Sequence, residues 1–168
     1  PDLSGLIECF KDHRAIYYAG ALKPLLEEHR DKLKPEVIWN IESGYTMTGE
    51  SYGDAMRERA RLFNAMAHFF ETYDLLALPT AIVPPYPVEQ RYVEEVNGHV
   101  FDSYIDWVYP AFLATMCSLP AISVPCGMTE SGLPVGLQLV GKPRGERALL
   151  AAARRLEEAA GLTGDVPP

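Results

Sequence analysis

Apolar residues in the first 73 positions recur at the spacing of helices. The stretch Glu8–His29 has this spacing, and Pro24 lies within it where one helix must end or bend, so two short helices are predicted there. Pro35 suits the first turn of another helix, because the amide hydrogen that proline lacks would be unpaired at that position. Gly44 and Gly49 are predicted to end this helix.

The clearest predicted helix begins near Ser51. Ser51 and Asp54 offer oxygen acceptors to the free amides of a first helical turn. Further along, apolar side chains recur every three or four residues, at Met56, Ala60, Phe63, Ala67 and Phe70. A helix packs through such a stripe, so we predict one buried face, with Met56, Phe63, Met66 and Phe70 in the core rather than in a cofactor site.

From residue 74 onward the pattern becomes that of strands and loops. Asp74–Thr80 is a short apolar run ended by proline, as expected of a buried strand. The proline-rich segment after it, up to Asn97–Gly98, is predicted to be an extended loop with a small hairpin. Phe101–Met116 is predicted to be a helix that is interrupted near Pro110.

The carboxyl-terminal third predicts two strands and a helix. Pro120–Gly127 and Leu133–Gly141 read as strands, and the short connection between them indicates antiparallel neighbours. A last helix is predicted from Gly145 to Ala160, where Gly161 ends it, and the residues beyond Gly161 are predicted to be a tail.

Together these elements predict an α/β fold. A helical part over residues 1–73 and a strand-rich part over residues 74–168 are expected to form one structural unit. Three mostly apolar strands are too few for a sheet that is covered on both faces, so further strands are expected beside them. The sheet is therefore predicted to be incomplete in this chain.

Composition excludes several classes of protein. Hydrophobic residues make up 48% and charged residues 23% of the chain, which is typical of a globular protein. The net charge of -8 argues against nucleic-acid binding, and no apolar run is long enough for a bilayer. Cys9, Cys117 and Cys126 cannot all pair within one chain, which favours a reducing compartment, the cytoplasm. A chain that begins at Pro1 is expected to be processed, truncated or cut from a longer one.

The usual catalytic and metal-binding motifs are missing from the sequence. Gly136–Lys142 has the spacing of a phosphate loop, but its spacer is strand-like and Pro143 replaces the hydroxyl residue that would bind magnesium. No serine lies in a G-x-S-x-G or S-x-x-K arrangement, and Ser123 is predicted to have a structural role or a hydroxyl bonded to the backbone rather than to be a nucleophile. The histidines lack the spacing of a zinc site, and Cys126 is predicted to be a small buried side chain. No metal or cofactor is expected.

One acidic and aromatic cluster is a candidate ligand-facing edge. Asp102 and Asp106 are predicted to lie one helical turn apart, beside Tyr104 and Trp107. Aromatic residues near a helix also pack in cores, so the cluster either faces a ligand or packs.

Four segments carry a family resemblance. Leu119–Gly127 and Gly132–Pro143 resemble the carboxyl-terminal hallmark of amidase-signature enzymes in their spacing, prolines and glycines. Asp74–Thr80 resembles the family's strand and Pro-Thr turn, and Tyr104–Trp107 resembles a Tyr-x-Asp-Trp element of some broad-specificity members. The resemblance implies that the chain is the carboxyl-terminal part of a larger amidase domain, with a mixed sheet flanked by helices.

The resemblance also implies hydrolysis of carboxamides to carboxylate and ammonia through an acyl-enzyme. The family's serine nucleophile, its second serine in a cis peptide and its lysine base lie in a Gly/Ser-rich stretch upstream of the matched region. This chain contains no Gly-Gly and no Ser-Ser, so it is expected to carry no catalytic residue and to be inactive alone.

The same resemblance implies substrate-binding residues and partners. The proline-rich loop and the segment Tyr104–Thr115 are expected to wall the acyl pocket, with Tyr104, Asp106, Trp107 and Thr115 as substrate-binding residues. Thr115 stands where many glutamyl-tRNA amidotransferase A subunits have an asparagine, which favours simple hydrolysis. The expected partners are the amino-terminal portion of the same amidase, a small amide substrate and a second copy of the chain in a homo-oligomer. Neither nucleic acid nor membrane is expected as a partner. The alternative is a non-catalytic assembly or dimerisation module that pairs through the unfinished sheet edge.

Overall fold

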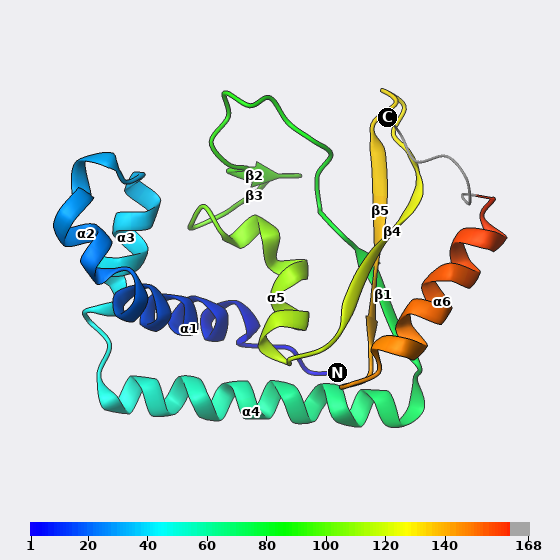
Figure 1. The fold of residues 1–168 in the computed structure, drawn as a ribbon, viewed down its shortest axis with the longest axis horizontal. Coiled ribbons are helices and arrows are strands. Elements are labelled where there is room, and N and C mark those ends of the chain that lie inside the picture. Colours follow the sequence, from blue (N-terminus) through cyan, green and yellow to red (C-terminus); the bar gives the residue numbers. More distant parts are fainter. Residues whose placement is uncertain (162–168) are drawn as a thin grey trace. The chain divides into compact units, whose positions relative to one another are not determined.

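Four helices account for most of the first 72 residues in the computed structural model, which describes residues 1–161 (Figure 1). They are α1 (Leu6–Ala21), α2 (Lys23–His29), α3 (Pro35–Gly44) and α4 (Gly49–Thr72), with a short 3-10 helix η1 at Arg30–Lys32. The two helices predicted around Pro24 are confirmed, and Pro24 lies in the first turn of α2. Pro35 begins α3, as predicted.

Helices α1 and α3 pack closely within a compact unit that spans Asp2–Ala65. The close approach depends on Gly44, because a Cβ atom at this position would lie 2.2 Å from the backbone oxygen of Ala15. Leu6, Cys9 and Ile41 are buried in the core of this unit.

Helix α4 begins two residues earlier than predicted. The amide of Thr48 donates to the Ser51 hydroxyl (2.8 Å), and the amide of Ser51 donates to the Thr48 hydroxyl (3.1 Å). This reciprocal pair satisfies two backbone donors at the start of the helix. The prediction that Gly49 ends the preceding helix is therefore wrong, because Gly49 begins α4. Asp54 forms an ion pair with Arg57.

The buried face of α4 also differs from the predicted one. Ala55, Leu62, Met66 and Phe70 are buried, whereas Met56 and Phe63 are 41% and 38% exposed. Ala60 is exposed as well. The apolar arc of α4 is wide enough to contain both rows of residues, and the described chain covers only the row that begins at Ala55. Of the residues predicted to form the core, Met66 and Phe70 belong to the buried row.

The strand-rich unit begins at Met66, within α4. Its elements are β1 (Leu75–Pro79), the hairpin strands β2 (Glu95–Val96) and β3 (His99–Val100), the 3-10 helix η2 (Asp106–Val108), α5 (Tyr109–Met116), β4 (Ala121–Met128), β5 (Pro134–Gly141) and α6 (Glu146–Ala159). The predicted strands, hairpin and last helix are confirmed. Pro110 lies in the first turn of α5, so it begins a helix and does not interrupt one.

The three long strands form one sheet in the order β1-β5-β4, and both pairings are antiparallel. Helices α5 and α6 lie on opposite sides of this sheet (Figure 1). On one face, Leu149 and Ala153 of α6 pack against Val124 and Leu139. On the other face, the buried Gln138 donates from Nε2 to the carbonyl oxygen of Pro110 at the start of α5 (3.1 Å).

The α/β class is thus confirmed, with a three-stranded sheet in the part of the chain that the structure describes. The mixed sheet implied by the family resemblance refers to the larger amidase domain and not to these three strands alone. The division into residues 1–73 and 74–168 stays a prediction, and the predicted tail beyond Gly161 lies outside the described residues. Within residues 1–161, no helix combines the length and the apolar character that a membrane span requires.

Candidate functional site

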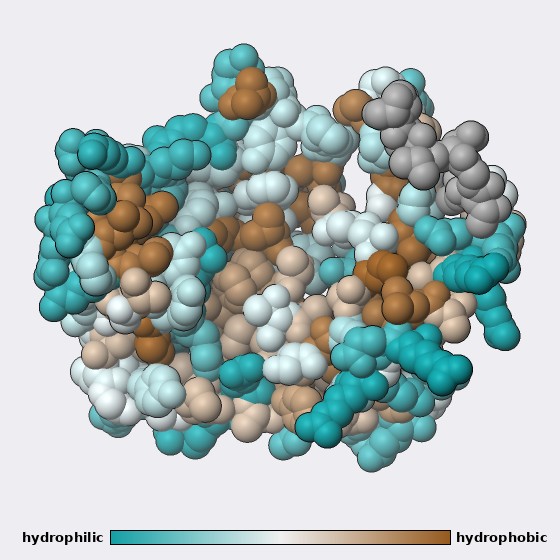
Figure 2. Space-filling model, in the orientation of Figure 1, coloured by the Kyte–Doolittle hydropathy of each residue, from teal (hydrophilic) through white to brown (hydrophobic). Residues whose placement is uncertain are grey.

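A pocket of about 690 Å³ opens on the sheet face that α5 covers only in part. It is lined by Thr80–Tyr86 after β1, by Trp107 of η2, and by residues of β4 and β5 and of the turn between them. In Figure 2 the surface is hollowed next to these elements, with apolar side chains at its border. Most of the lining residues are apolar, and four of them are prolines.

Two hydroxyl groups meet in this pocket. Thr80 Oγ1 and Ser123 Oγ are 2.7 Å apart, although Thr80 follows β1 and Ser123 lies on β4, with β5 between them. The residue between them is Gly136, to which Thr80 is also joined by a backbone hydrogen bond (3.1 Å). A Cβ atom on Gly136 would lie 2.5 Å from Ser123 Oγ and 2.9 Å from Thr80 Oγ1. Glycine on the central strand is therefore what lets the two side chains meet.

This hydroxyl pair corrects the predicted partner of Ser123. The sequence predicted a structural role or a hydrogen bond to the backbone, and in the structure the hydroxyl instead pairs with another side chain at the pocket. Thr80, Ser123 and Gly136 were not predicted as site residues. A glycine inside an apolar strand was the available signal, because it often marks the close approach of other groups.

Aromatic rings form one wall of the pocket. The rings of Tyr86 and Trp107 pack edge to face, with centroids 5.6 Å apart. Trp107 is the one predicted substrate-binding residue that lines the pocket.

Asp106 and Tyr104 lie beside this wall without lining the pocket. Asp106 is only 6% exposed, and its Oδ2 accepts a hydrogen bond from the amide of Ser103 (2.9 Å). This bond fixes the turn that leads into η2 and thereby the position of Trp107. The Tyr104 ring contacts Tyr92, with centroids 6.3 Å apart.

Asp102 of the predicted cluster and the predicted substrate-binding residue Thr115 also lie outside the pocket lining. Asp102 is exposed in a bend before η2, so the prediction that it lies one helical turn from Asp106 is wrong. Thr115 lies on the exposed side of α5, and its hydroxyl donates to the carbonyl oxygen of Ala111 (3.2 Å). Substrate binding by Tyr104, Asp106, Trp107 and Thr115 stays a prediction.

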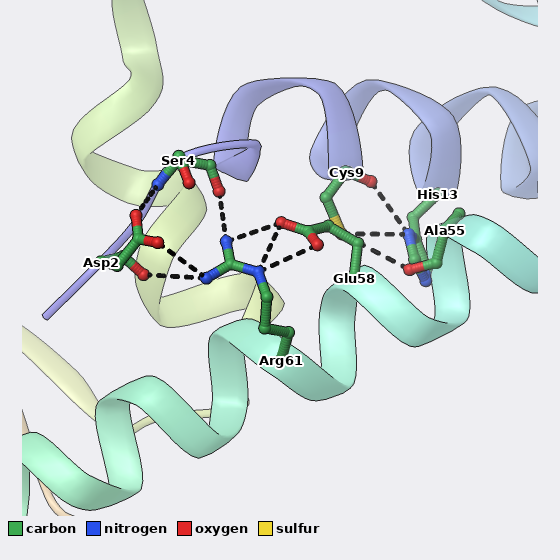
Figure 3. A network of polar contacts seen from close by, with 7 residues as sticks. All are labelled: Asp2, Ser4, Cys9, His13, Ala55, Glu58 and Arg61. Carbon is green, nitrogen blue, oxygen red and sulfur yellow. Dashed lines mark hydrogen bonds and ion pairs between the residues drawn. The ribbon is translucent and has the colours of Figure 1, made fainter.

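A separate polar network lies in the helical unit (Figure 3). The Arg61 guanidinium donates to the Glu58 carboxylate, to Asp2 and to the carbonyl oxygen of Ser4. Its hydrogen bonds lower the pKa of Glu58, and Glu58 raises the pKa of Arg61 in turn. The network joins the start of the chain to α4.

Cys9 and His13 lie at the edge of this network without forming a catalytic pair (Figure 3). His13 Nδ1 is 2.9 Å from the carbonyl oxygen of Cys9, so Nδ1 must carry its proton to donate there. A protonated Nδ1 cannot take the proton of the Cys9 thiol, 3.7 Å away. The thiol is 3.7 Å from the carbonyl oxygen of Ala55 and donates to it. Both side chains are structural.

The remaining candidates for metal or thiol chemistry give no site. Within residues 1–161, no group of three His, Cys, Asp or Glu side chains is placed to hold a metal ion. Cys9 and Cys117 are buried, but Cys126 is exposed, so the prediction of a buried side chain at position 126 is wrong. Cys126 follows Pro125 where the register of β4 shifts, and alternation along the strand no longer fixes its side.

Comparisons with known proteins identify the family. A family model described as Amidase matches residues 12–150. The A subunit of the glutamyl-tRNA(Gln) amidotransferase from Alkaliphilus metalliredigens is 31% identical over 160 residues, which cover 92% of this chain and 31% of that protein. The corresponding protein from Prochlorococcus marinus is 36% identical over 116 residues, which cover 69% of this chain and 23% of that protein.

Solved structures agree with the family model. The crystal structure of an amidase superposes with a TM-score of 0.83 at 25% identity, over 94% of this chain and 36% of that one. A bacterial aryl acylamidase of the amidase signature family shares the fold, with a TM-score of 0.81 at 20% identity over 100% of this chain and 37% of that one. The chain spans about a third of the length of these relatives. On the match over residues 12–150, and as the hallmark in Leu119–Pro143 predicted, this chain belongs to the amidase family of amidase-signature enzymes.

Proposed function

We propose that this chain is the carboxyl-terminal part of an amidase that hydrolyses carboxamides to carboxylate and ammonia. A serine nucleophile, a second serine in a cis peptide and a lysine base form the acyl-enzyme, which water then cleaves. All three belong to the amino-terminal portion of the same polypeptide. Membership of the amidase family supports this chemistry at an amide C–N bond.

The observation that carries the proposal is a substrate-sized pocket with hydroxyls but without a base. Thr80 and Ser123 are the paired hydroxyls, and among residues 1–161 the pocket lining includes no Lys, His, Asp or Glu. A hydroxyl is a weak nucleophile until a neighbouring base takes its proton. The pocket of this chain is therefore suited to holding a substrate, while cleavage requires groups from elsewhere.

Trp107 is the residue that we expect to contact the substrate, and Asp106 positions it. The carboxylate of Asp106 holds the turn before η2, so removing it is expected to let the indole move. Tyr104 and Thr115 belong to the same proposed wall of the acyl pocket, although neither lines the described pocket.

The test compares the chain alone with the polypeptide that also contains the amino-terminal portion. Ammonia release from small primary amides is expected only from the longer polypeptide. In that polypeptide, Trp107→Ala and Asp106→Asn are expected to change the ratio of kcat/KM between an aromatic and an aliphatic amide. Amide hydrolysis by the chain alone would refute the proposal that the catalytic residues lie in the amino-terminal portion. If both variants keep the parent's ratio of kcat/KM between the two amides, Trp107 and Asp106 do not determine substrate preference.

A second candidate function is that of one component of an amidotransferase. It is favoured by the curated relatives at 30–36% identity, which are named as A subunits of glutamyl-tRNA(Gln) amidotransferase. This function predicts ammonia release from glutamine and its use by partner proteins. The family resemblance implies an asparagine at position 115 in many amidotransferase A subunits, so Thr115 favours simple hydrolysis. A polypeptide that releases ammonia from glutamine in preference to all other amides would establish the second candidate.

The proposed partners follow from the proposal that this chain is the carboxyl-terminal part of an amidase. They are the amino-terminal portion of the amidase, a small amide substrate and a second copy of the chain. The described residues pair β4 on one side only, with β5, so its other edge is available for another strand. Within residues 1–161, Cys9, Cys117 and Cys126 form no disulfide, which supports placement in the cytoplasm. Absence of amide hydrolysis, together with strand pairing at β4, would favour a non-catalytic assembly module instead.

A further inference from the structure

We infer that the pocket binds an uncharged aromatic carboxamide, with the Thr80–Ser123 hydroxyl pair as the polar anchor for a substituent on its ring. This inference rests on the proposed function and narrows its substrate class. It selects uncharged aromatic primary amides over amino-acid amides such as glutamine.

The uncharged lining of the pocket is the first observation that supports an uncharged ligand. The residues that line the pocket include no charged side chain. Glutamine carries an ammonium group and a carboxylate, and burying either group without a counter-charge is costly. An uncharged ring loses no such hydration. The described part of the pocket therefore disfavours glutamine.

The aromatic wall of the pocket is the second observation, and it supports an aromatic ligand. Tyr86 and Trp107 already pack edge to face, with centroids 5.6 Å apart. A third ring can join such a pair in an edge-to-face or offset arrangement, and each such contact is favourable by about 0.5–1.5 kcal/mol beyond the area buried. Pro84, Pro85 and Pro125 make the surrounding surface apolar and stiff.

The hydroxyl pair is the third observation, and it supports a ligand with a neutral polar substituent. Each hydroxyl has one proton and two acceptor lone pairs. One hydroxyl donates to the other across 2.7 Å, so the accepting hydroxyl can turn its own proton toward a ligand. The pair can thus donate one hydrogen bond and accept another, which suits a phenol or a similar neutral substituent. Gly136 keeps the space above the pair open, because any Cβ atom there would collide with Ser123 Oγ.

Binding to the 168-residue chain itself provides a test that does not depend on catalysis. Trp39 and Trp107 are the two tryptophans, so Trp39→Phe leaves Trp107 as the reporter in the pocket wall. We expect 4-hydroxybenzamide to change the Trp107 fluorescence saturably and glutamine to leave it unchanged. Loss of one hydrogen bond in Ser123→Ala or Thr80→Val is expected to weaken 4-hydroxybenzamide about 2- to 10-fold and benzamide by less.

The control variant is Ser43→Ala, which removes a hydroxyl of the helical unit that donates to the carbonyl oxygen of Trp39. It is expected to bind both benzamides as the parent does. Equal binding of glutamine and 4-hydroxybenzamide would overturn the inference. So would an unchanged ratio of the two benzamide affinities in both hydroxyl variants. These outcomes leave the proposed hydrolysis intact, whereas a longer polypeptide that releases no ammonia refutes the proposed function without altering the binding result.

Discussion

Asp12 is a carboxyl group on α1 that folding removes partly from water. Desolvation raises the pKa of Asp12, the nearby Glu8 raises it further, and His13 opposes the shift. The folded state therefore binds a proton at Asp12 more readily than the unfolded state does. The contribution of this proton to stability is present at low pH and is lost as pH rises through the pKa of the folded state.

This shift predicts that Asp12→Asn stabilises the chain at neutral pH. The amide has no charge to desolvate, so the free energy of unfolding at pH 7 is expected to rise by about 0.5 kcal/mol. At pH 3 the difference from the parent is expected to shrink, because Asp12 is then largely protonated. Urea unfolding at both pH values measures this. The control is Asp31→Asn at an exposed position, and a gain at pH 3 equal to that at pH 7 would contradict the explanation.

Gly44 makes a second residue-scale prediction, since it is the point where α3 approaches α1 most closely. In Gly44→Ala, the new methyl would lie 2.2 Å from Ala15 O and 2.5 Å from Ala19 Cβ, so the helices must move apart. The expected cost is about 1–3 kcal/mol in thermal or urea unfolding. Gly20→Ala on α1 is the matched control: nothing lies within 4 Å of its Cβ position. Alanine there is expected to stabilise by up to about 1 kcal/mol, and destabilisation of equal size in both variants would argue against a steric cause.

Site residues were the hardest feature to predict from the sequence. Ser123 and Thr80 are 43 positions apart, and only the strand order β1-β5-β4 brings their hydroxyls together over Gly136. That order depends on long-range pairing, which no local pattern states. Trp107 was identified through a family resemblance in four consecutive residues. Cys126 was misplaced because a register shift interrupts the alternation of β4.

At the scale of elements, helix ends were easier to predict than helix faces. Pro24 and Pro35 begin helices for a local reason, the fixed φ angle of proline and its missing amide hydrogen. Helix α4 starts two residues before the predicted position because Thr48 and Ser51 cap it jointly, whereas the prediction rested on the acceptors of Ser51 and Asp54. The buried face of α4 depends on which neighbour covers it, so a wide apolar arc leaves the choice open.

Adjacent residues of α4 offer a direct test of the assigned face. Leu62 is 0% exposed, and Leu62→Ala is expected to cost about 2–5 kcal/mol through lost burial and the cavity left behind. Phe63 is the larger side chain but is 38% exposed, and Phe63→Ala is expected to cost about 1 kcal/mol. Urea unfolding of the two variants gives the order. A larger loss for Phe63→Ala would restore the face that the apolar spacing predicted.

At the scale of the whole molecule, the incomplete sheet and the family agree. Three strands were judged too few from their apolar character, and the described sheet has three. The relatives are about three times as long as this chain. The proposed membership of this sheet in a larger domain would account for the largely exposed β4 and for the exposed Met56 and Phe63 of α4.

The two tryptophans report separately on the two compact units. Trp39 lies in the unit Asp2–Ala65, and Trp107 lies in the unit that begins at Met66. The boundary falls within α4, which continues from Gly49 to Thr72 without a linker. If the helical unit unfolds, the seven residues from Met66 to Thr72 are too few to persist as an isolated helix, and the burial of Met66 and Phe70 is lost with them. Unfolding of one unit is therefore expected to destabilise the other.

This coupling predicts coincident unfolding of the single-tryptophan variants Trp39→Phe and Trp107→Phe. Their fluorescence midpoints in urea are expected to agree with each other and with the loss of helical circular dichroism of the same variant, as in a two-state transition. Ala65→Pro, added to each variant, breaks α4 at the boundary at a cost of about 3 kcal/mol or more and is expected to separate the midpoints. Separate midpoints without the proline would mean that each unit is stable by itself. In that case the helical unit could unfold while the pocket wall at Trp107 stays folded, although both units share α4.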